Sequence, residues 1–425
     1  MKFVLLSFSL VLLLSCKTEP VINITNPSDY DKYLTVSKKD TSSKYFEIWN
    51  NKIKPDSSQL LSFGVVAGEY NRYFKNTGDI KFLKKAEKAL KKAVEVANIG
   101  KAGYLRALAR NYISQHRFNE ALVLADSASY IGSGVKESQA LLFDIHMELG
   151  NYDVAKKYLD STENISSFGY LIRVAKWNDY KGDLETTIRF MEKAMAKAED
   201  SKNIGLRIWS YSNIADYYGH AGRIKDSYDH YIKTLQLDSS NAYAKKGIAW
   251  IVFSYEHKPK EALRILNAVV KNNKSPDYVL LQSEIAEYMG EELERIEFME
   301  DYFKVIKTPS LNHMYSAYTI PLYLDVTEQY SKALHLAKQE VLNRPTPEAY
   351  SLLAKTYLKM GENEIALSII DQYIVDKTFE PAILFRAAEV YKAVGYSDKV
   401  SELKKELTGA FYELGPLMES KILSL

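Results

Sequence analysis

The stretch TYLKMGENEIALSII, residues 356–370, is matched further along the chain by VYKAVGYSDKVSEL, residues 390–403. In each stretch a tyrosine is followed four residues later by a glycine, and a small or β-branched residue comes five residues after that. On both sides of Gly361, apolar residues recur at intervals of three and four, which is the period of an amphipathic helix. A glycine between two helical stretches suits a tight or left-handed turn. The two stretches therefore predict a helix–turn–helix hairpin that is repeated along the chain.

The same spacing recurs over most of the sequence. It forms a frame of four positions: one residue, an aromatic residue three later, a turn residue four after that, and a small residue five further on. The small position falls at 86, 121, 155, 187, 227, 262, 295, 333, 366 and 400, so successive copies are spaced almost evenly. One hairpin cannot bury its apolar face alone, so neighbouring copies must stack. The predicted fold is all-α: a right-handed α-solenoid of about ten stacked hairpins with helical caps. We expect local distortion at the copies that contain Arg295 and Pro321.

The phrase YYGHAGRIKDSYDHYIKTLQLDSSNAYA, from Tyr217, resembles the tetratricopeptide repeat (TPR) family, although Ser239 stands where the family has its closing proline. The resemblance implies that first helices line a concave face that binds a protein or peptide partner. The positions that the family would use there are Arg106, Arg110, Asp144, Glu148, Lys176, Tyr180, Asp216, His220, Lys355 and Lys359. Arg106 and Arg110 are four apart, a geometry able to grip a carboxylate. The family's carboxylate clamp pairs a lysine with an asparagine, and Arg110 departs from that pattern.

The first sixteen residues, MKFVLLSFSLVLLLSC, have the build of a cleaved export signal. The apolar run is shorter than the roughly 20 residues that span a bilayer. Cys16 is the only cysteine in the chain, so no internal disulfide can form. Its position resembles a bacterial lipobox of the Bacteroidota-like envelope type, in which the thiol is lipidated, and Lys17 in place of an aspartate favours the outer membrane. An ordinary export signal that carries a cysteine by chance is the alternative.

These signals predict five segments. They are a lipoprotein signal peptide at 1–15, a lipidated tether at 16–29, an N-terminal helical cap at 30–58, the TPR-like solenoid at 59–407 and a C-terminal capping helix at 408–425. The tether sequence contains two prolines and no helical apolar period. Caps are expected because the ends of a solenoid need a partly polar outer face.

Composition and motifs argue against several function classes. The 56 Lys and Arg balance 54 Asp and Glu, and the basic residues are diluted along helices, which disfavours nucleic acid as a partner. The chain lacks HExxH, GxSxG, CxxC and GxxxxGK patterns, and its seven histidines are scattered. We therefore expect no catalytic, cofactor-binding or metal-binding residues and no enzymatic activity.

The sequence as a whole predicts an outer-membrane-anchored TPR scaffold lipoprotein that binds a protein or peptide on its concave face. The alternative is a glycan-binding lipoprotein that partners an outer-membrane sugar transporter (SusD-like). Such proteins carry long irregular insertions around the sugar site, whereas the even spacing of the copies here leaves little chain to build one. An enzyme with a dispersed site is a third interpretation. The identity of the partner, the side of the membrane and the oligomeric state stay open at this point.

Overall fold

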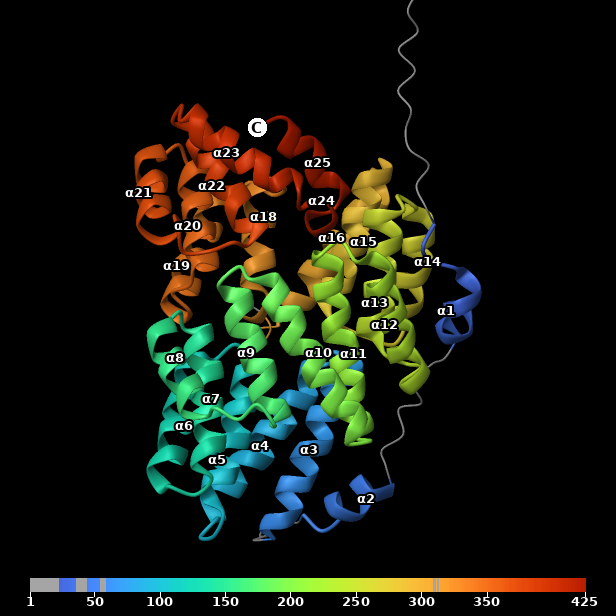
Figure 1. The fold of residues 1–425 in the computed structure, drawn as a ribbon, viewed down its shortest axis with the longest axis vertical. Helices are drawn as coiled ribbons and strands as arrows, with labels where there is room; N and C mark the ends of the chain where they lie inside the picture. The colour runs from blue at the N-terminus through green and yellow to red at the C-terminus, as the bar shows by residue number, and fades with distance from the viewer. Residues whose placement is uncertain (1–22, 36–43, 54–58, 309–310, 312) are drawn as a thin grey trace, which may run out of the picture.

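The computed structural model describes residues 23–35, 44–53, 59–308, 311 and 313–425 (Figure 1). The predicted signal peptide, Cys16 and parts of the predicted tether and N-terminal cap lie outside these ranges. All regular elements in the described ranges are helices, which confirms the all-α prediction. None of these helices is both long enough and apolar enough to cross a bilayer.

In the described part of the chain, ten hairpins follow one another, as the repeat predicts. They are α3 (Leu60–Thr77) with α4 (Ile80–Val96), α5 (Lys101–Ile113) with α6 (Phe118–Ile131), α7 (Val135–Glu148) with α8 (Tyr152–Ser161), α9 (Phe168–Tyr180) with α10 (Leu184–Asp200), α11 (Ile204–His220) with α12 (Ile224–Leu237), α13 (Ala242–Trp250) and the π-helix η1 (Ile251–Tyr255) with α14 (Pro259–Val270), α15 (Pro276–Met289) with α16 (Glu292–Ile306), α18 (Ser316–Asp325) with α19 (Tyr330–Asn343), α20 (Pro347–Lys359) with α21 (Asn363–Tyr373), and α22 (Pro381–Ala393) with α23 (Ser397–Thr408). A 3₁₀-helix, η2 (His313–Tyr315), precedes α18.

The turn position of every frame adopts a left-handed backbone, which confirms the predicted hairpin geometry. Positive φ angles occur at Gly78, His116, Gly150, Gly182, Gly222, His257, Gly290, Glu328, Gly361 and Gly395. A side chain at such a φ is strained, so glycine is the usual choice. The turn therefore keeps its left-handed backbone even where the turn residue carries a side chain, because the second helix can start only from that conformation.

The small position of the frame lies where the two helices of a hairpin cross. Eight of its residues are fully buried: Ala86, Ala121, Ala155, Thr187, Ser227, Ala262, Ala333 and Ala366. Of the other two, Val400 is 6% exposed, whereas Arg295 stays partly exposed and its guanidinium pairs with Glu292 at 2.6 Å. Pro321 lies inside α18, which is only 10 residues long. The copy with Pro321 has a short first helix, whereas the copy with Arg295 keeps two regular helices, α15 and α16. The π-helix η1 is an irregularity that the repeat does not predict.

Successive coils of the solenoid touch each other. The Lys274 amide donates to the Thr77 carbonyl at 2.7 Å, and the Asn343 side-chain amide donates to the His116 carbonyl at 2.9 Å. A Cβ at Gly150 would lie 2.6 Å from the Pro345 carbonyl oxygen. Hairpin turns of the first half therefore rest on loops of the second half, and the lower end of α19 faces the hairpins of the first half (Figure 1). The concave face therefore forms the wall of an interior that both halves of the chain line.

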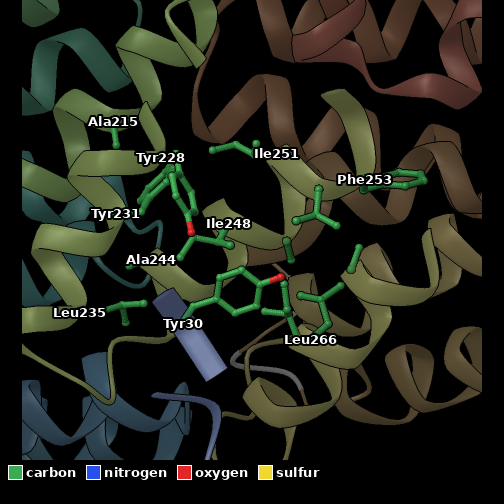
Figure 2. Close-up of a cluster of buried hydrophobic side chains, with 14 of the residues drawn as sticks. Tyr30, Ala215, Tyr228, Tyr231, Leu235, Ala244, Ile248, Ile251, Phe253 and Leu266 are labelled. Atoms are coloured by element: carbon green, nitrogen blue, oxygen red, sulfur yellow. The ribbon is translucent and has the colours of Figure 1, made fainter. Parts of the chain in front are cut away.

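The N-terminal segment docks on the middle of the solenoid. The Ile24 and Thr25 amides both donate to one carboxylate oxygen of Glu256, at 2.7 and 2.6 Å. Helix α1 (Pro27–Leu34) then packs against α12 and α14, and Tyr30, 1% exposed, enters their apolar cluster (Figure 2). Helix α2 (Lys44–Asn50) packs instead on α3. The two helices of the predicted N-terminal cap therefore lie on different parts of the solenoid, and α1 begins within the predicted tether.

The C-terminal segment also reaches back along the chain. The predicted capping helix is two helices, α24 (Phe411–Leu414) and α25 (Pro416–Leu423), separated by Gly415 at φ +83° and ψ 162°. This backbone conformation is essentially restricted to glycine. In α25, Ile422 is fully buried in the apolar core of the last hairpin. Helix α24 contacts α11 and η1, which belong to the middle of the chain.

Candidate functional site

Three adjoining cavities occupy the interior of the coil. Their volumes are about 460, 550 and 320 Å³, and they are called the first, second and third cavity below. The first and second share Arg344 and Glu348 in their walls. The second and third share Leu280, Glu284 and Tyr318. Each cavity is of the size that proteins use to hold a small ligand or a few side chains of a partner.

The first cavity lies between α7, α9 and α11 on one side and the loops before α20 and α22 on the other. Glu148 is paired there with Lys176 at 2.8 Å and with Arg344 at 3.6 Å. Among the described residues, no cation lies within salt-bridge distance of Asp179 or Glu380. Asp179 accepts only a long hydrogen bond from Tyr217, at 3.5 Å. The cavity therefore holds carboxylates that the described part of the protein leaves without a matching positive charge.

The pKa values of these carboxyls reflect that shortage. Burial, and then the charge of Glu380, raise the pKa of Asp179 to about 6. Burial also raises the pKa of Glu380, to which Glu413 adds. Burial raises the pKa of Glu413 as well, against the influence of His220, whose Nδ1 lies 3.9 Å from the Glu413 carboxylate. A cationic group entering the cavity would stabilise the ionised carboxylates and lower all three pKa values.

Aromatic rings stand beside the carboxylates. Tyr152 and Tyr180 stack with their ring centroids 3.9 Å apart. Phe379 is 54% exposed, although one side of its ring lies against the turn at Gly182, where a Cβ would come within 2.5 Å. Exposed aromatic faces attract cations and cover apolar stems. The first cavity therefore combines the two features that suit a lysine or arginine side chain of a partner.

The second and third cavities hold isolated charged groups. Burial, with Glu287 nearby, raises the pKa of Glu284 to about 7. Burial lowers the pKa of Arg386 to about 10, and its guanidinium donates to the Ser351 hydroxyl at 3.0 Å. In the third cavity Asp216 accepts hydrogen bonds from Tyr231 and Tyr243. Acidic groups are thus present in all three cavities.

The ten residues predicted for partner binding fall into two groups. Glu148, Lys176, Tyr180 and His220 line the first cavity, and Asp216 lines the third. Arg106, Arg110, Asp144, Lys355 and Lys359 line none of these three cavities. Of the second group, four are engaged between neighbouring elements. Arg106 donates to the Ser133 carbonyl at 2.7 Å, Asp144 pairs with Arg173 at 2.6 Å, and Lys355 and Lys359 each lie 2.8 Å from Asp325.

The carboxylate grip expected of Arg106 and Arg110 is not assembled, because Arg106 is directed to the next inter-hairpin turn. Conversely, the sequence prediction does not include several residues of the first cavity: Arg344, Phe379, Glu380 and Glu413. They come from loops between hairpins and from the C-terminal segment, outside the repeat frame. The contact between coils brings them inside, and the repeat pattern carries no signal for that contact. Over the described residues, no group of three or more His, Cys, Asp or Glu side chains is arranged to hold a metal ion.

No protein-family model matches the chain, and no curated protein matches it by sequence. Solved structures with a similar fold include a tetratricopeptide repeat protein from Parabacteroides merdae, 16% identical, with a TM-score of 0.39 over 55% of this chain and 92% of that one. Human IFIT1, in a dimer with PPP-AAAA, is 12% identical, with a TM-score of 0.45 over 80% of this chain and 95% of that one. The fold assignment therefore rests on the helices themselves: the chain is an α-solenoid of TPR-like hairpins whose two halves contact each other.

Proposed function

We propose that the protein is a non-catalytic scaffold that binds a basic segment of a partner protein in the interior of its coil. A lipid on Cys16 would hold the scaffold at the bacterial outer membrane. The observation that carries the proposal is the first cavity, where Asp179 and Glu380 have no cationic partner within the described ranges and lie beside the exposed ring of Phe379. A lysine or arginine side chain would supply the missing charge and lay its methylene stem on the ring.

The charge of the interior also separates this proposal from nucleic-acid binding. Phosphate groups need arginine and lysine side chains with free donors. In the first cavity Lys176 and Arg344 are already paired with Glu148, and Arg344 also pairs with Glu340 at 2.7 Å. Lys377, at the rim, donates to the Gln372 carbonyl. The carboxylates that are left would repel a phosphate backbone. A basic polypeptide is the macromolecule that this surface favours.

Cross-linking from inside the cavity tests the binding proposal. A photo-cross-linking residue in place of Phe379 is expected to capture a partner protein in intact cells. The same residue in place of Tyr130, which is 95% exposed on α6, serves as the matched outer-surface control and is expected to capture none of that partner. Adding Asp179→Asn and Glu380→Gln should reduce the yield from position 379 by about tenfold or more, because the cavity loses the two carboxylates that lack a cationic partner. Equal adducts from positions 379 and 130, or none from 379, would contradict the proposal.

The proposed anchor is tested by changing the thiol. Wild-type protein is expected to incorporate labelled fatty acid and to sediment with outer membranes. Cys16→Ser should abolish the label and release the protein, because stable attachment of such a protein needs covalently bound acyl chains. Ser15→Ala is the matched neighbouring substitution and should keep both the label and the membrane fraction. Labelling that persists in Cys16→Ser would disprove lipidation at this residue.

A glycan is the second candidate ligand, because stacked aromatic rings beside carboxylates also suit a sugar ring. The pair of Tyr152 and Tyr180 in the first cavity is the observation that favours it. Tight, specific binding on a glycan array that is lost in Phe379→Ala would favour a glycan over a protein segment as the ligand of the first cavity. Retention of protein cross-linking at position 379 without glycan binding would keep the scaffold proposal.

A further inference from the structure

The C-terminal segment occupies part of the inner face that the hairpins would offer to a partner. The latch, residues 411–416, comprises α24 with Gly415 and Pro416. It lies against the first helices of two successive hairpins, α11 and α13–η1, and α25 continues onto α15, the first helix of the next. His220, one of the residues predicted for partner binding, faces Glu413 of the latch at 3.9 Å.

The contacts of the latch with the groove centre on Tyr412. The Tyr412 carbonyl accepts two hydrogen bonds, from the Trp250 indole at 3.1 Å and from the Ser254 hydroxyl at 2.7 Å. The Tyr412 ring lies over Gly219, where a Cβ would come within 2.8 Å of it. The surface thus binds one backbone carbonyl and one aromatic ring, as a peptide-binding groove does.

The second half of the latch meets the same surface with a glycine of its own. A Cβ at Gly415 would lie 2.8 Å from the Trp250 ring and 3.1 Å from the Glu284 carboxylate. Its φ of +83° also excludes other residues in practice. An aromatic residue followed three residues later by Gly-Pro is therefore what this groove accommodates in the structure.

The latch is attached to the rest of the molecule independently of these contacts. Beyond it, Ile422 of α25 is buried with Leu384 and Leu407 in the last hairpin, and the Lys404 ammonium donates to the Leu423 carbonyl at 2.5 Å. Helix α24 itself has only four residues. Phe411 and Leu414 of the latch also pack on this core, and α24 contacts α22. The latch therefore leaves the groove only by giving up these contacts as well, while Ile422 keeps α25 in place.

We propose that the latch is an internal ligand of the groove formed by α11, η1 and α15, and that a partner segment with an aromatic residue and a following Gly-Pro binds there by replacing it. The latch forms part of the wall of the first cavity through Glu413, and Gly415 lies against Trp250 and Glu284, which line the third. This inference depends on the proposed function in one respect: the segment that replaces the latch is taken to belong to a partner protein.

Purified full-length protein and a labelled peptide of residues 409–418, GAFYELGPLM, test the proposal. Tyr412→Ala weakens the latch and leaves the groove intact, so the peptide should bind this variant at least tenfold more tightly than wild type in fluorescence anisotropy. Gly219→Ala also expels the latch, but its methyl group fills the ring position, so this variant should bind the peptide no better than wild type. Tyr130→Ala is the matched surface control, and a peptide with alanine at the Tyr412 position is the matched ligand control.

Hydrogen exchange reports the position of the latch in the same variants. The Leu414 and Gly415 amides should exchange about tenfold faster or more in Tyr412→Ala and Gly219→Ala, while α22 and α25 keep wild-type protection. Equal peptide affinity for wild type and Tyr412→Ala would overturn the proposal. So would faster exchange throughout α22–α25, which would show that the latch is a structural cap of the last hairpin. The cross-linking test of the proposed function uses other variants and a cellular partner. A negative result in one experiment therefore leaves the other proposal untouched.

Discussion

Replacing Phe253 by alanine is expected to lower the free energy of unfolding by about 3–5 kcal/mol, the usual cost of truncating a fully buried phenylalanine. Phe253 is 0% exposed in η1 and belongs to the apolar cluster that Tyr30 enters from the N-terminal segment. Its ring meets Tyr288 edge to face, with centroids 5.4 Å apart. Truncation leaves a cavity beside Trp250 and Tyr288, so η1 loses packing against α13 and α15.

Urea denaturation followed by circular dichroism measures the effect. Tyr130→Ala removes an aromatic side chain that is 95% exposed, and its free energy of unfolding should stay within about 0.5 kcal/mol of wild type. Hydrogen exchange should show that the Ile24 and Thr25 amides lose protection in Phe253→Ala. A stability loss below about 1 kcal/mol would mean that the cluster relaxes around the missing ring, contrary to this packing.

Gly247→Ala is expected to cost roughly 2–4 kcal/mol, although alanine is the better helix former. Gly247 lies in α13, and a Cβ there would sit 2.2 Å from Cζ of Tyr231. That ring has no room to retreat, because it is 4% exposed and its hydroxyl donates to Asp216. The added methyl group must therefore either push the helices apart or break a buried hydrogen bond.

The matched control is the same substitution at an open site. Gly68 lies in α3, and nothing described stands within 4 Å of the position its Cβ would take. Gly68→Ala should stabilise the protein by about 0.5–1 kcal/mol, because alanine loses less backbone entropy in a helix. Thermal or urea unfolding of the two variants should thus shift in opposite directions. Equal shifts would show that helix propensity, rather than the crossing at Tyr231, decides the outcome at residue 247.

The hairpins could be predicted because each depends on a short-range pattern. The turn at Gly361 and the buried small residue at Ala366 are set by backbone sterics and by one helix crossing, and both are visible within one short stretch of sequence. Spacing alone places even His116 and His257 at turns, and both have positive φ. Local geometry of this kind repeats, so its signal accumulates along the chain.

The candidate site could be predicted only in part, because it depends on long-range geometry. Glu148 and His220 are predictable because they follow the packing positions of their own helices. Glu380 and Glu413 reach the same cavity only after the coil has closed, and small changes in the angle between hairpins add up along the stack. The docking of Thr25 on Glu256 joins residues 231 apart, and nothing in either local sequence marks the pair.

The contacts between coils change how the molecule holds together. A solenoid whose repeats touch only their neighbours has a stability close to a sum of repeat and interface contributions, and its ends can fray one unit at a time. Here the hydrogen bond from Asn343 to the His116 carbonyl links positions 227 residues apart. The hydrogen bond from Lys274 to the Thr77 carbonyl joins a second pair of hairpins from the two halves. Loss of either end therefore removes support from hairpins on the adjacent coil. The two halves are bound into one cooperative unit, and the width of the interior is fixed by this mutual bracing.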